Sequence, residues 1–275
     1  MMTPCFSTLG CVDYTLDEIL ALAARFGIPA LELRGMDGAV KPEQIPALSP
    51  DRIAGTAAAL AAAVRPVVYG SSIACTDAAR EPAKLTAGFG EIDTAAALGF
   101  PNVRVFGNRY IDGDEAASVQ AAAAVLRELC AYAAPRGITI LLEVHGDFVH
   151  AETFEALFAA LAGVPNFGLI WDVAHSDGPY GDGWLPFWRT IAPYTRHVHI
   201  KDHRRAAAGS PKKLTQLGEG EIPLVPILRQ LAADGYDGCV SLEWERKWHP
   251  ELPPIEAALE RFCAILAEAG VGHSD

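Results

Sequence analysis

The feature that most constrains this chain is a repeating alternation of short apolar runs with longer helical runs. The short runs are mainly β-branched or apolar, a pattern typical of strands buried in a parallel sheet. Between them lie alanine- and leucine-rich runs with apolar residues at helical spacing. The sequence therefore predicts eight consecutive strand–helix units.

These units are placed by residue range. The predicted strands are Pro4–Leu9, Ala30–Arg34, Pro66–Gly70, Val103–Phe106, Thr139–His145, Phe167–Asp172, His197–Asp202 and Cys239–Glu243. The predicted helices are Thr15–Arg25, Pro50–Val64, Pro82–Leu98, Asp114–Ala134, Ala151–Ala162, Leu185–Ala192, Pro223–Asp234 and Pro254–Ala269.

Several helix ends carry a local signal. The run TLDE, beginning at Thr15, is a capping box in which the threonine and Glu18 bond each other's backbone amides. A glycine follows a helix in LGFPNV (Gly99), RGIT (Gly137) and YDGC (Gly238), and we predict that each ends its helix in the left-handed conformation.

Eight such units in 275 residues, with no break in composition, favour an α/β fold of one (β/α)8 barrel, a TIM barrel, over an open doubly wound sheet. We expect a single domain over residues 1–275, large enough to bury a sizeable core. The open sheet would call for a glycine-rich phosphate loop after an early strand. Neither G-x-G-x-x-G nor a P-loop occurs in the sequence.

Composition excludes some classes of partner. The formal net charge of −12 would repel nucleic acid. No run of eighteen uncharged apolar residues occurs, and the first residues lack a basic segment followed by an apolar one, so we expect a cytoplasmic protein with no membrane partner. The six cysteines form no C-x-x-C pair, and we expect buried thiols.

Four candidate metal ligands fall at the carboxyl ends of different predicted strands. Side chains alternate between the two faces of a strand, and the outward face of a barrel strand must be apolar. Glu143, His199 and Glu243 then point inward, and Asp172 shares its face with Ile170. In a barrel these ends meet at one mouth, where catalytic groups lie.

Three carboxylates gathered there would repel one another without a cation. A set of three carboxylates and one imidazole is hard and rich in oxygen. We therefore expect one divalent metal ion, manganese before magnesium, cobalt or zinc.

Other polar residues near this mouth have two readings each. His197 lies one layer deeper than His199 and is a hydrogen-bonded core histidine or a support for a ligand. Lys201 faces inward and either steadies a substrate oxygen or forms an ion pair with a carboxylate. Glu32, with Arg34, pairs with neighbours or meets substrate, and Trp248 forms an aromatic wall or packs in a loop.

Taken together, the runs LLEVHGD, WDVAH, HVHIKD, GEGEIP and GYDGCVSLEWE resemble the xylose isomerase-like superfamily of sugar (phosphate) isomerases and epimerases, in order and spacing over roughly residues 1–270. The resemblance implies a mononuclear metal site formed by Glu143, Asp172, His199 and Glu243. It also implies that Glu143 and Glu243 flank the substrate and exchange a proton with carbon. A homo-oligomer, dimer or tetramer, is implied as well.

Within the superfamily, the chain resembles the ketose 3-epimerase branch. His175 and Arg205 resemble positions that contact substrate oxygens in that branch. The branch has a second glutamate six residues after the first metal glutamate, whereas this chain has Val149. The change argues against activity on free ketohexoses. His145 and its polar neighbours Asp147 and His150 offer a different contact pattern.

The leading hypothesis is an isomerase or epimerase of a small sugar, sugar phosphate or hydroxycarbonyl acid. A metal on the carbonyl and hydroxyl oxygens stabilises the enediolate that forms when a proton leaves the neighbouring carbon, so a glutamate suffices as base. The main alternative is a metal-dependent dehydratase, a lyase, on a related polyol or keto acid. An apurinic endonuclease is disfavoured by the acidic charge, and a metal-binding module without catalysis is the remaining alternative.

Overall fold

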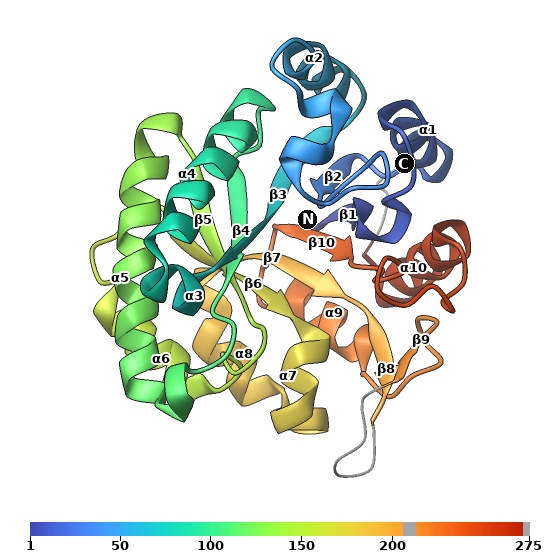
Figure 1. Ribbon diagram of the computed structural model, residues 1–275. Coiled ribbons are helices and arrows are strands. Elements are labelled where there is room, and N and C mark those ends of the chain that lie inside the picture. Colours follow the sequence, from blue (N-terminus) through green and yellow to red (C-terminus); the bar gives the residue numbers. More distant parts are fainter. Residues whose placement is uncertain (206–212, 272–275) are drawn as a thin grey trace. The chain divides into compact units, whose positions relative to one another are not determined.

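The computed structural model describes residues 1–205 and 213–271. Within these ranges eight parallel strands form a closed barrel in the order β1-β10-β7-β6-β5-β4-β3-β2 (Figure 1). The barrel strands are β1 (Thr3–Ser7), β2 (Ala30–Leu33), β3 (Arg65–Ala74), β4 (Asn102–Phe106), β5 (Thr139–Glu143), β6 (Phe167–Asp172), β7 (Thr195–Ile200) and β10 (Cys239–Leu242). The predicted α/β class and TIM barrel are confirmed.

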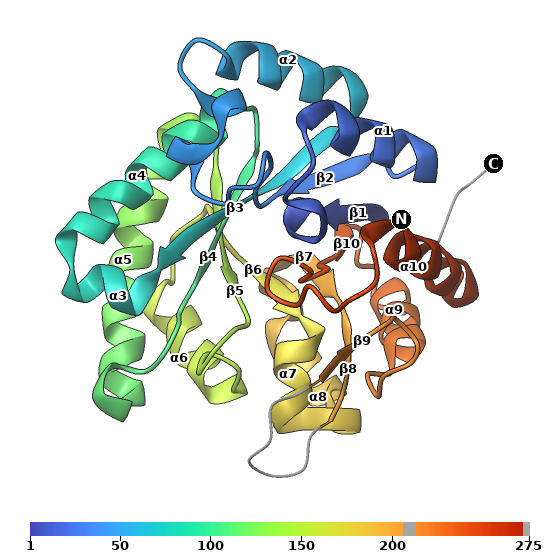
Figure 2. The ribbon, with the colours of Figure 1, turned by 45° about the vertical axis from the view of Figure 1, so that its right-hand side comes forward.

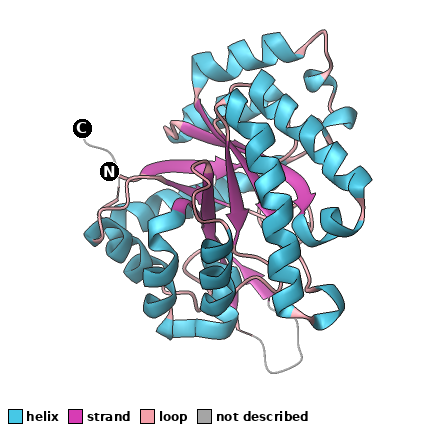
Figure 3. Cartoon of the chain, turned by 90° about the vertical axis from the view of Figure 1, so that its left-hand side faces the viewer, coloured by secondary structure: helices cyan, strands magenta, loops and turns pink. Residues whose placement is uncertain are grey.

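Helices alternate with the strands along the chain, and Figure 3 distinguishes the two kinds of element by colour. They are α1 (Leu16–Phe26), α2 (Ile53–Ala63), α3 (Cys75–Arg80), α4 (Pro82–Ala97), α5 (Glu115–Ala133), α6 (Ala151–Ala160), α7 (Val173–Tyr180), α8 (Leu185–Ile191), α9 (Leu224–Ala233) and α10 (Ile255–Ala269). All eight predicted helices are present. The sequence analysis missed the short helices α3 and α7.

The chain divides into two compact units. The first combines Met1–Pro66 with His197–Asp275, and the second is the continuous segment Val67–Arg196. In the first unit β1 pairs in parallel with both β2 and β10, and β10 pairs with β7. In the second unit β3, β4, β5 and β6 pair in sequence order. A single domain over residues 1–275 stays a prediction.

Burial on both faces explains the composition of the strands. Every residue of β2, β6 and β10 is buried, as expected for parallel strands covered on the outside by helices and filled inside by side chains. In β6 the indole of Trp171 stacks on Trp188 with ring centroids 5.0 Å apart. Asp172, the next residue, is also fully buried, so the strand ends with a carboxylate inside the protein.

The predicted helix ends are mostly confirmed. Thr15 caps α1, with its amide donating to Glu18 Oε2 at 2.8 Å, and the capping box is complete. Gly99 and Gly137 have positive φ. The prediction for Gly238 was wrong: the left-handed residue after α9 is Gly235, whose N–H donates to Ala232 O at 3.1 Å. Gly238 instead lies next to β10.

A two-stranded hairpin follows β7, and the sequence analysis did not predict it (Figure 2). It consists of β8 (Asp202–Arg204) and β9 (Lys213–Thr215), paired antiparallel. Asp202 accepts backbone N–H groups from Gly218 at 2.9 Å, Gly220 at 3.0 Å and Ile222 at 3.2 Å. A Cβ on Gly220 would lie 2.1 Å from Asp202 Oδ1. The conformation of the run GEGEIP thus depends on the carboxylate of Asp202 and on Gly220, whose missing side chain lets the carboxylate approach the backbone.

The six cysteines are free thiols, and all are buried except Cys263, which is partly exposed. Burial raises the pKa of Cys130 to about 12. These positions confirm the expectation of core thiols. Among the helices that the structure describes, none has the length and apolar character that a membrane crossing requires.

Candidate metal centre

In the second unit, two predicted ligands lie at the ends of neighbouring strands. Glu143 is the last residue of β5 and pairs in register with Ile170, two residues before Asp172 at the end of β6. Because side chains alternate, Glu143 and Asp172 share one face. Their candidate ligand oxygens lie within 4.8 Å of each other, and both residues are buried. Two buried carboxylates this close favour a cation between them.

The backbone after β6 orients Asp172. Its Oδ1 accepts the amide N–H groups of Ala174 at 2.8 Å and His175 at 3.1 Å, so Asp172 caps α7. Trp171 Nε1 donates to Ser176 Oγ at 2.9 Å and ties the first turn of the helix to the strand. The second carboxylate oxygen, Oδ2, lies 3.8 Å from His175 Nε2. The backbone of the run WDVAHS therefore fixes Asp172 Oδ1 by hydrogen bonds and orients Oδ2 toward His175.

Glu143 has a buried cationic partner that the sequence analysis missed. Arg104 Nη1 on β4 donates to Glu143 Oε2 at 3.1 Å, and both side chains are less than a tenth exposed. The signal was present in NVRVF, where the alternate valines Val103 and Val105 mark the outward face and leave the arginine facing inward. Its positive charge offsets part of the repulsion between the carboxylates of this unit.

Two histidines predicted to contact substrate lie together in the same unit. The rings of His145 and His175 are 4.1 Å apart between centroids, and His145 also stacks on Phe106 at 5.3 Å. The His175 side chain is 30% exposed. The two imidazoles thus lie beside Asp172, partly open to solvent, as a substrate contact requires.

In the first unit, the other two predicted ligands also face each other. His199 Nδ1 lies 3.5 Å from Glu243 Oε2, and both residues are buried. Lys201 Nζ donates to Glu243 Oε2 at 2.6 Å and also to Glu245 Oε1. Of the two readings for Lys201, the ion pair with a carboxylate is the one present.

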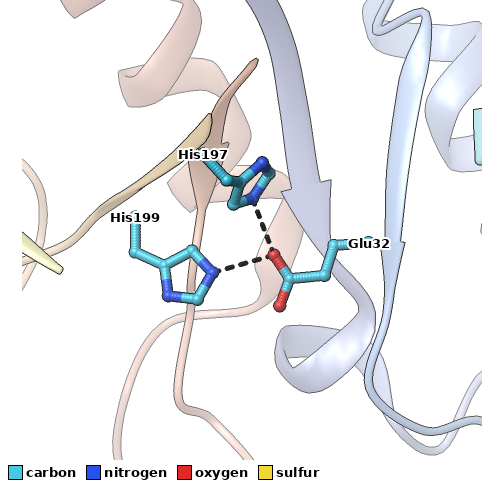
Figure 4. Close-up of side chains that lie close together, drawn as sticks. All are labelled: Glu32, His197 and His199. Atoms are coloured by element: carbon cyan, nitrogen blue, oxygen red, sulfur yellow. Dashed lines mark hydrogen bonds and ion pairs between the residues drawn. The ribbon is translucent and has the colours of Figure 1, made fainter. Parts of the chain in front are cut away.

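A second group of side chains lies deeper in this unit. Glu32 Oε2 accepts from His197 Nε2 at 3.0 Å and from His199 Nε2 at 2.9 Å, and all three side chains are fully buried (Figure 4). Burial alone would raise the pKa of Glu32, but the imidazoles of His199 and His197 outweigh it and leave that pKa lowered. Burial lowers the pKa of His197. His197 is therefore a hydrogen-bonded core histidine, one of its two predicted readings.

The remaining predicted residues lie at the surface or in the core. Trp248 is 54% exposed in the segment after β10. Arg205 is exposed directly after β8. Val149, at the position where the ketose 3-epimerase pattern has glutamate, is buried.

The donor chemistry of both units fits a hard divalent ion. Glu143, Asp172 and Glu243 carry carboxylate oxygens and His199 carries an imidazole nitrogen, the donor types that manganese, magnesium, cobalt and zinc accept. A comparison of the chain with protein families adds a match to the model described as "Xylose isomerase-like TIM barrel", over residues 20–265. The chain belongs to this family. The resemblance in the five sequence runs is thereby confirmed.

Curated relatives of the xylose isomerase-like chain include carbohydrate enzymes. It is 34% identical to the C-glycoside deglycosidase alpha subunit of Arthrobacter globiformis over 103 residues, which is 37% of this chain and 25% of the relative. It is 30% identical to fructoselysine 3-epimerase of Escherichia coli O157:H7 over 149 residues, 52% of each chain. The matches thus span between a quarter and about half the length of these relatives.

Solved structures resemble the xylose isomerase-like barrel over nearly its full length. The IOLI protein, crystallised with a bound zinc atom, has a TM-score of 0.78 at 20% identity, with 98% of each chain covered. The probable 3-DHS dehydratase AsbF of Bacillus anthracis has a TM-score of 0.76 at 16% identity, covering 95% of this chain and 98% of its own. At these identities the likeness shows the fold.

Proposed function

We propose that this chain is a divalent-metal-dependent isomerase or epimerase of a small sugar, sugar phosphate or hydroxycarbonyl acid. The observation that carries the proposal is a matched arrangement in the two units. Each unit has two buried side chains of the kinds that bind metals, with candidate ligand atoms within 4.8 Å of each other. These pairs are Glu143 with Asp172, and His199 with Glu243. All four stand at or directly after the carboxyl ends of barrel strands.

In this proposal the four residues hold one ion, manganese in the first instance. The strand order supports it, because β5, β6, β7 and β10 are consecutive in the barrel and the carboxyl ends of parallel barrel strands lie at one mouth. The fixed direction of Asp172 and the nitrogen that His199 turns toward Glu243 suit an ion at that mouth. When bound, the ion stabilises the negative charge that develops on substrate oxygens as a carbon-bound proton leaves.

The chain's own residues would then move the proton. One of the two glutamates, Glu143 or Glu243, removes it from the carbon beside the carbonyl. If the same carboxylate returns the proton to the adjacent carbon, the result is isomerisation. If instead the opposite carboxyl group, protonated beforehand, gives its own proton to the other face of the same carbon, the result is epimerisation. Arg104 donates to Glu143 and Lys201 donates to Glu243, and these hydrogen bonds hold the two carboxyl groups in position.

A sugar-like substrate is supported by the relatives, which are named for a C-glycoside and for fructoselysine. We assign His175, His145 and Arg205 to substrate oxygens and Trp248 to an aromatic wall of the site, while the buried Lys201 serves as the ion-pair partner of Glu243. The buried Val149 disfavours a free ketohexose. We also propose that the chain forms a homo-oligomer, a dimer or a tetramer, which light scattering would measure. We propose a cytoplasmic location as well.

A dehydratase is the second candidate, favoured by the similarity of the fold to that of AsbF. The same metal and base serve both reactions, since a lyase removes the same proton and then expels a β-hydroxyl group. The products differ: the lyase product is lighter by one water, and the isomerase product has the mass of its substrate.

The test is a substrate panel in deuterated water with added manganese, followed by proton NMR and mass spectrometry. The panel contains ketoses, their phosphates, short hydroxycarbonyl acids, fructoselysine and a C-glycoside. We expect deuterium on a product carbon with no loss of water. Glu143→Gln and Glu243→Gln should each lower turnover by about 10²- to 10⁴-fold, whereas Glu260→Gln on the exposed side of α10 should not change it.

Other outcomes have defined meanings. Turnover that survives chelation and dialysis would contradict metal dependence. Loss of water would replace the isomerase by the dehydratase. Metal binding without turnover on any substrate would favour a binding module.

A further inference from the structure

Of the group formed by Glu32, His197 and His199, only His199 has a role in the function proposed above. The group joins the end of β2 to the interior of β7 (Figure 4). A single carboxylate oxygen, Glu32 Oε2, receives both imidazole nitrogens, at 3.0 Å and 2.9 Å, and also Ser241 Oγ at 3.3 Å. One buried oxygen thus receives three hydrogen-bond donors. A residue that only fills space in the core would need none of them.

The hydrogen bonds fix the proton positions on the rings. An ionised carboxylate only accepts, so each imidazole must present an N–H group at Nε2. A neutral imidazole carries one such proton, and its other nitrogen then has a lone pair. For His199 that other nitrogen is Nδ1, which lies 3.5 Å from Glu243 Oε2.

The geometry points to Glu32 as the residue that selects the metal-binding nitrogen of His199, by holding its ring in the Nε2–H tautomer with Nδ1 directed at the ion. This inference rests on the proposed function. It makes Glu32 a positioning residue in place of the substrate contact that the sequence suggested. A carboxylate behind a ligating histidine also makes the imidazole a stronger donor to the metal.

The second oxygen of Glu32 supports a functional reading. Among the described residues, Glu32 Oε1 is buried without a hydrogen-bond partner. A buried polar atom left unpaired is costly to the fold, and an apolar residue here would avoid that cost. The carboxylate of Glu32 costs stability at this position. We therefore expect its charge and its acceptor oxygen to act on the neighbouring imidazoles.

The three atoms could instead be ligands of a second ion, since they lie within 4.8 Å of one another. The hydrogen-bond distances favour the positioning role, because two N–H donors already satisfy the carboxylate oxygen. Metal stoichiometry separates the two readings: one divalent ion per chain fits positioning, and two would overturn it.

The experiment has two readouts, neither of which is activity. The first is the imidazole nitrogen NMR spectrum of the metal-free protein, with His199 assigned by comparison with His199→Gln. The second is Mn²⁺ affinity by competition with a chelator. In the unmodified chain we expect a protonated Nε2 and an unprotonated Nδ1 on His199.

Two substitutions separate charge from tautomer. Glu32→Leu removes the acceptor, so His199 should become a mixture of tautomers and Mn²⁺ should bind about 10- to 100-fold more weakly. Glu32→Gln retains an oxygen acceptor without the charge, so the tautomer should persist and the loss of affinity should be smaller. Ser241→Ala, the matched control, removes one hydrogen bond from the same oxygen and should leave the tautomer unchanged.

A proton on Nδ1 of His199 in the unmodified chain would overturn the inference, and so would unchanged affinity in Glu32→Leu. If Glu32→Leu does not fold, the spectrum of the unmodified chain and the affinity of Glu32→Gln decide. Absence of Mn²⁺ binding in the unmodified chain would instead refute the proposed function and the inference with it. If Mn²⁺ binds but its affinity does not depend on Glu32, the inference is refuted and the proposed function is not.

Discussion

The Arg104–Glu143 pair is the best-buried ion pair of the second unit that the structure describes. Removing one partner from such a pair leaves an uncompensated charge, whereas an exposed pair contributes little. We therefore expect Arg104→Met to lower the free energy of unfolding by about 3 kcal/mol. Chemical denaturation measures it. Adding Glu143→Gln should recover part of the loss, because no unpaired charge then remains.

The control for this prediction is Lys84→Met. Lys84 pairs with Glu81 at 2.8 Å, and both side chains are about half exposed or more. We expect a change below about 1 kcal/mol there. Equal losses in the two variants would contradict the claim that burial sets the strength of the Arg104 pair.

Tyr14 provides a pH-dependent contact in the first unit. Its hydroxyl donates to Glu256 Oε1 at 2.7 Å, and this hydrogen bond, with burial, raises the pKa of Tyr14 to about 12. The folded state therefore holds the phenol proton more tightly than the unfolded state does. The free energy of unfolding should fall as pH rises from about 10 to about 12, and less so in Tyr14→Phe. Denaturation curves across this range test it, and parallel curves would contradict it.

The sequence predicted the ligand residues better than their partners. Glu143 and Asp172 end their strands, and His199 and Glu243 lie within one residue of a strand end. A strand end can be read from a local run. Arg104 contacts Glu143 across 39 positions, a pairing set by strand register that no local run displays. The contact of Glu32 with His197, 165 positions away, is hidden in the same way.

At the scale of elements, strands and long helices were predicted because apolar periodicity repeats along them. The helix α7 was missed because VAHSDGPY is short, polar and ends with Pro179 and Tyr180. Its stability comes from the Asp172 cap and the bond between Trp171 and Ser176. Such a helix depends on tertiary contacts, so periodicity cannot reveal it.

The segment after the hairpin depends on Asp202 in a comparable way. In Asp202→Ala, the amides of Gly218, Gly220 and Ile222 lose their common acceptor. We expect hydrogen exchange at these three amides to quicken, with a loss of about 3 kcal/mol in unfolding free energy. For Asp202→Asn we expect exchange rates and an unfolding free energy between those of the unmodified chain and Asp202→Ala, because the asparagine amide retains one acceptor oxygen. Unchanged exchange in Asp202→Ala would show that other groups hold the segment.

At the scale of the whole molecule, metal binding should be visible as stability. If the proposed ion binds only the folded chain, Mn²⁺ at 100 times its dissociation constant adds about 2.7 kcal/mol. The midpoint of thermal unfolding should then rise by about 5–10 °C. Calorimetry with Mn²⁺ and then with a chelator measures this. The double variant Glu243→Gln with His199→Ala should show no rise, and an equal rise there would place the ion elsewhere.

The pairing of β1 with β10 has a consequence for biosynthesis. Thr3 of β1 aligns with Cys239 of β10, so β1 cannot dock on this neighbour until β10, the last barrel strand, has been translated. The segment 67–196 is continuous and meets no such delay. Nascent chains stalled at increasing lengths should therefore fold in two stages: the middle segment first, and the segments at the two ends of the chain only after release of residue 242 from the exit tunnel.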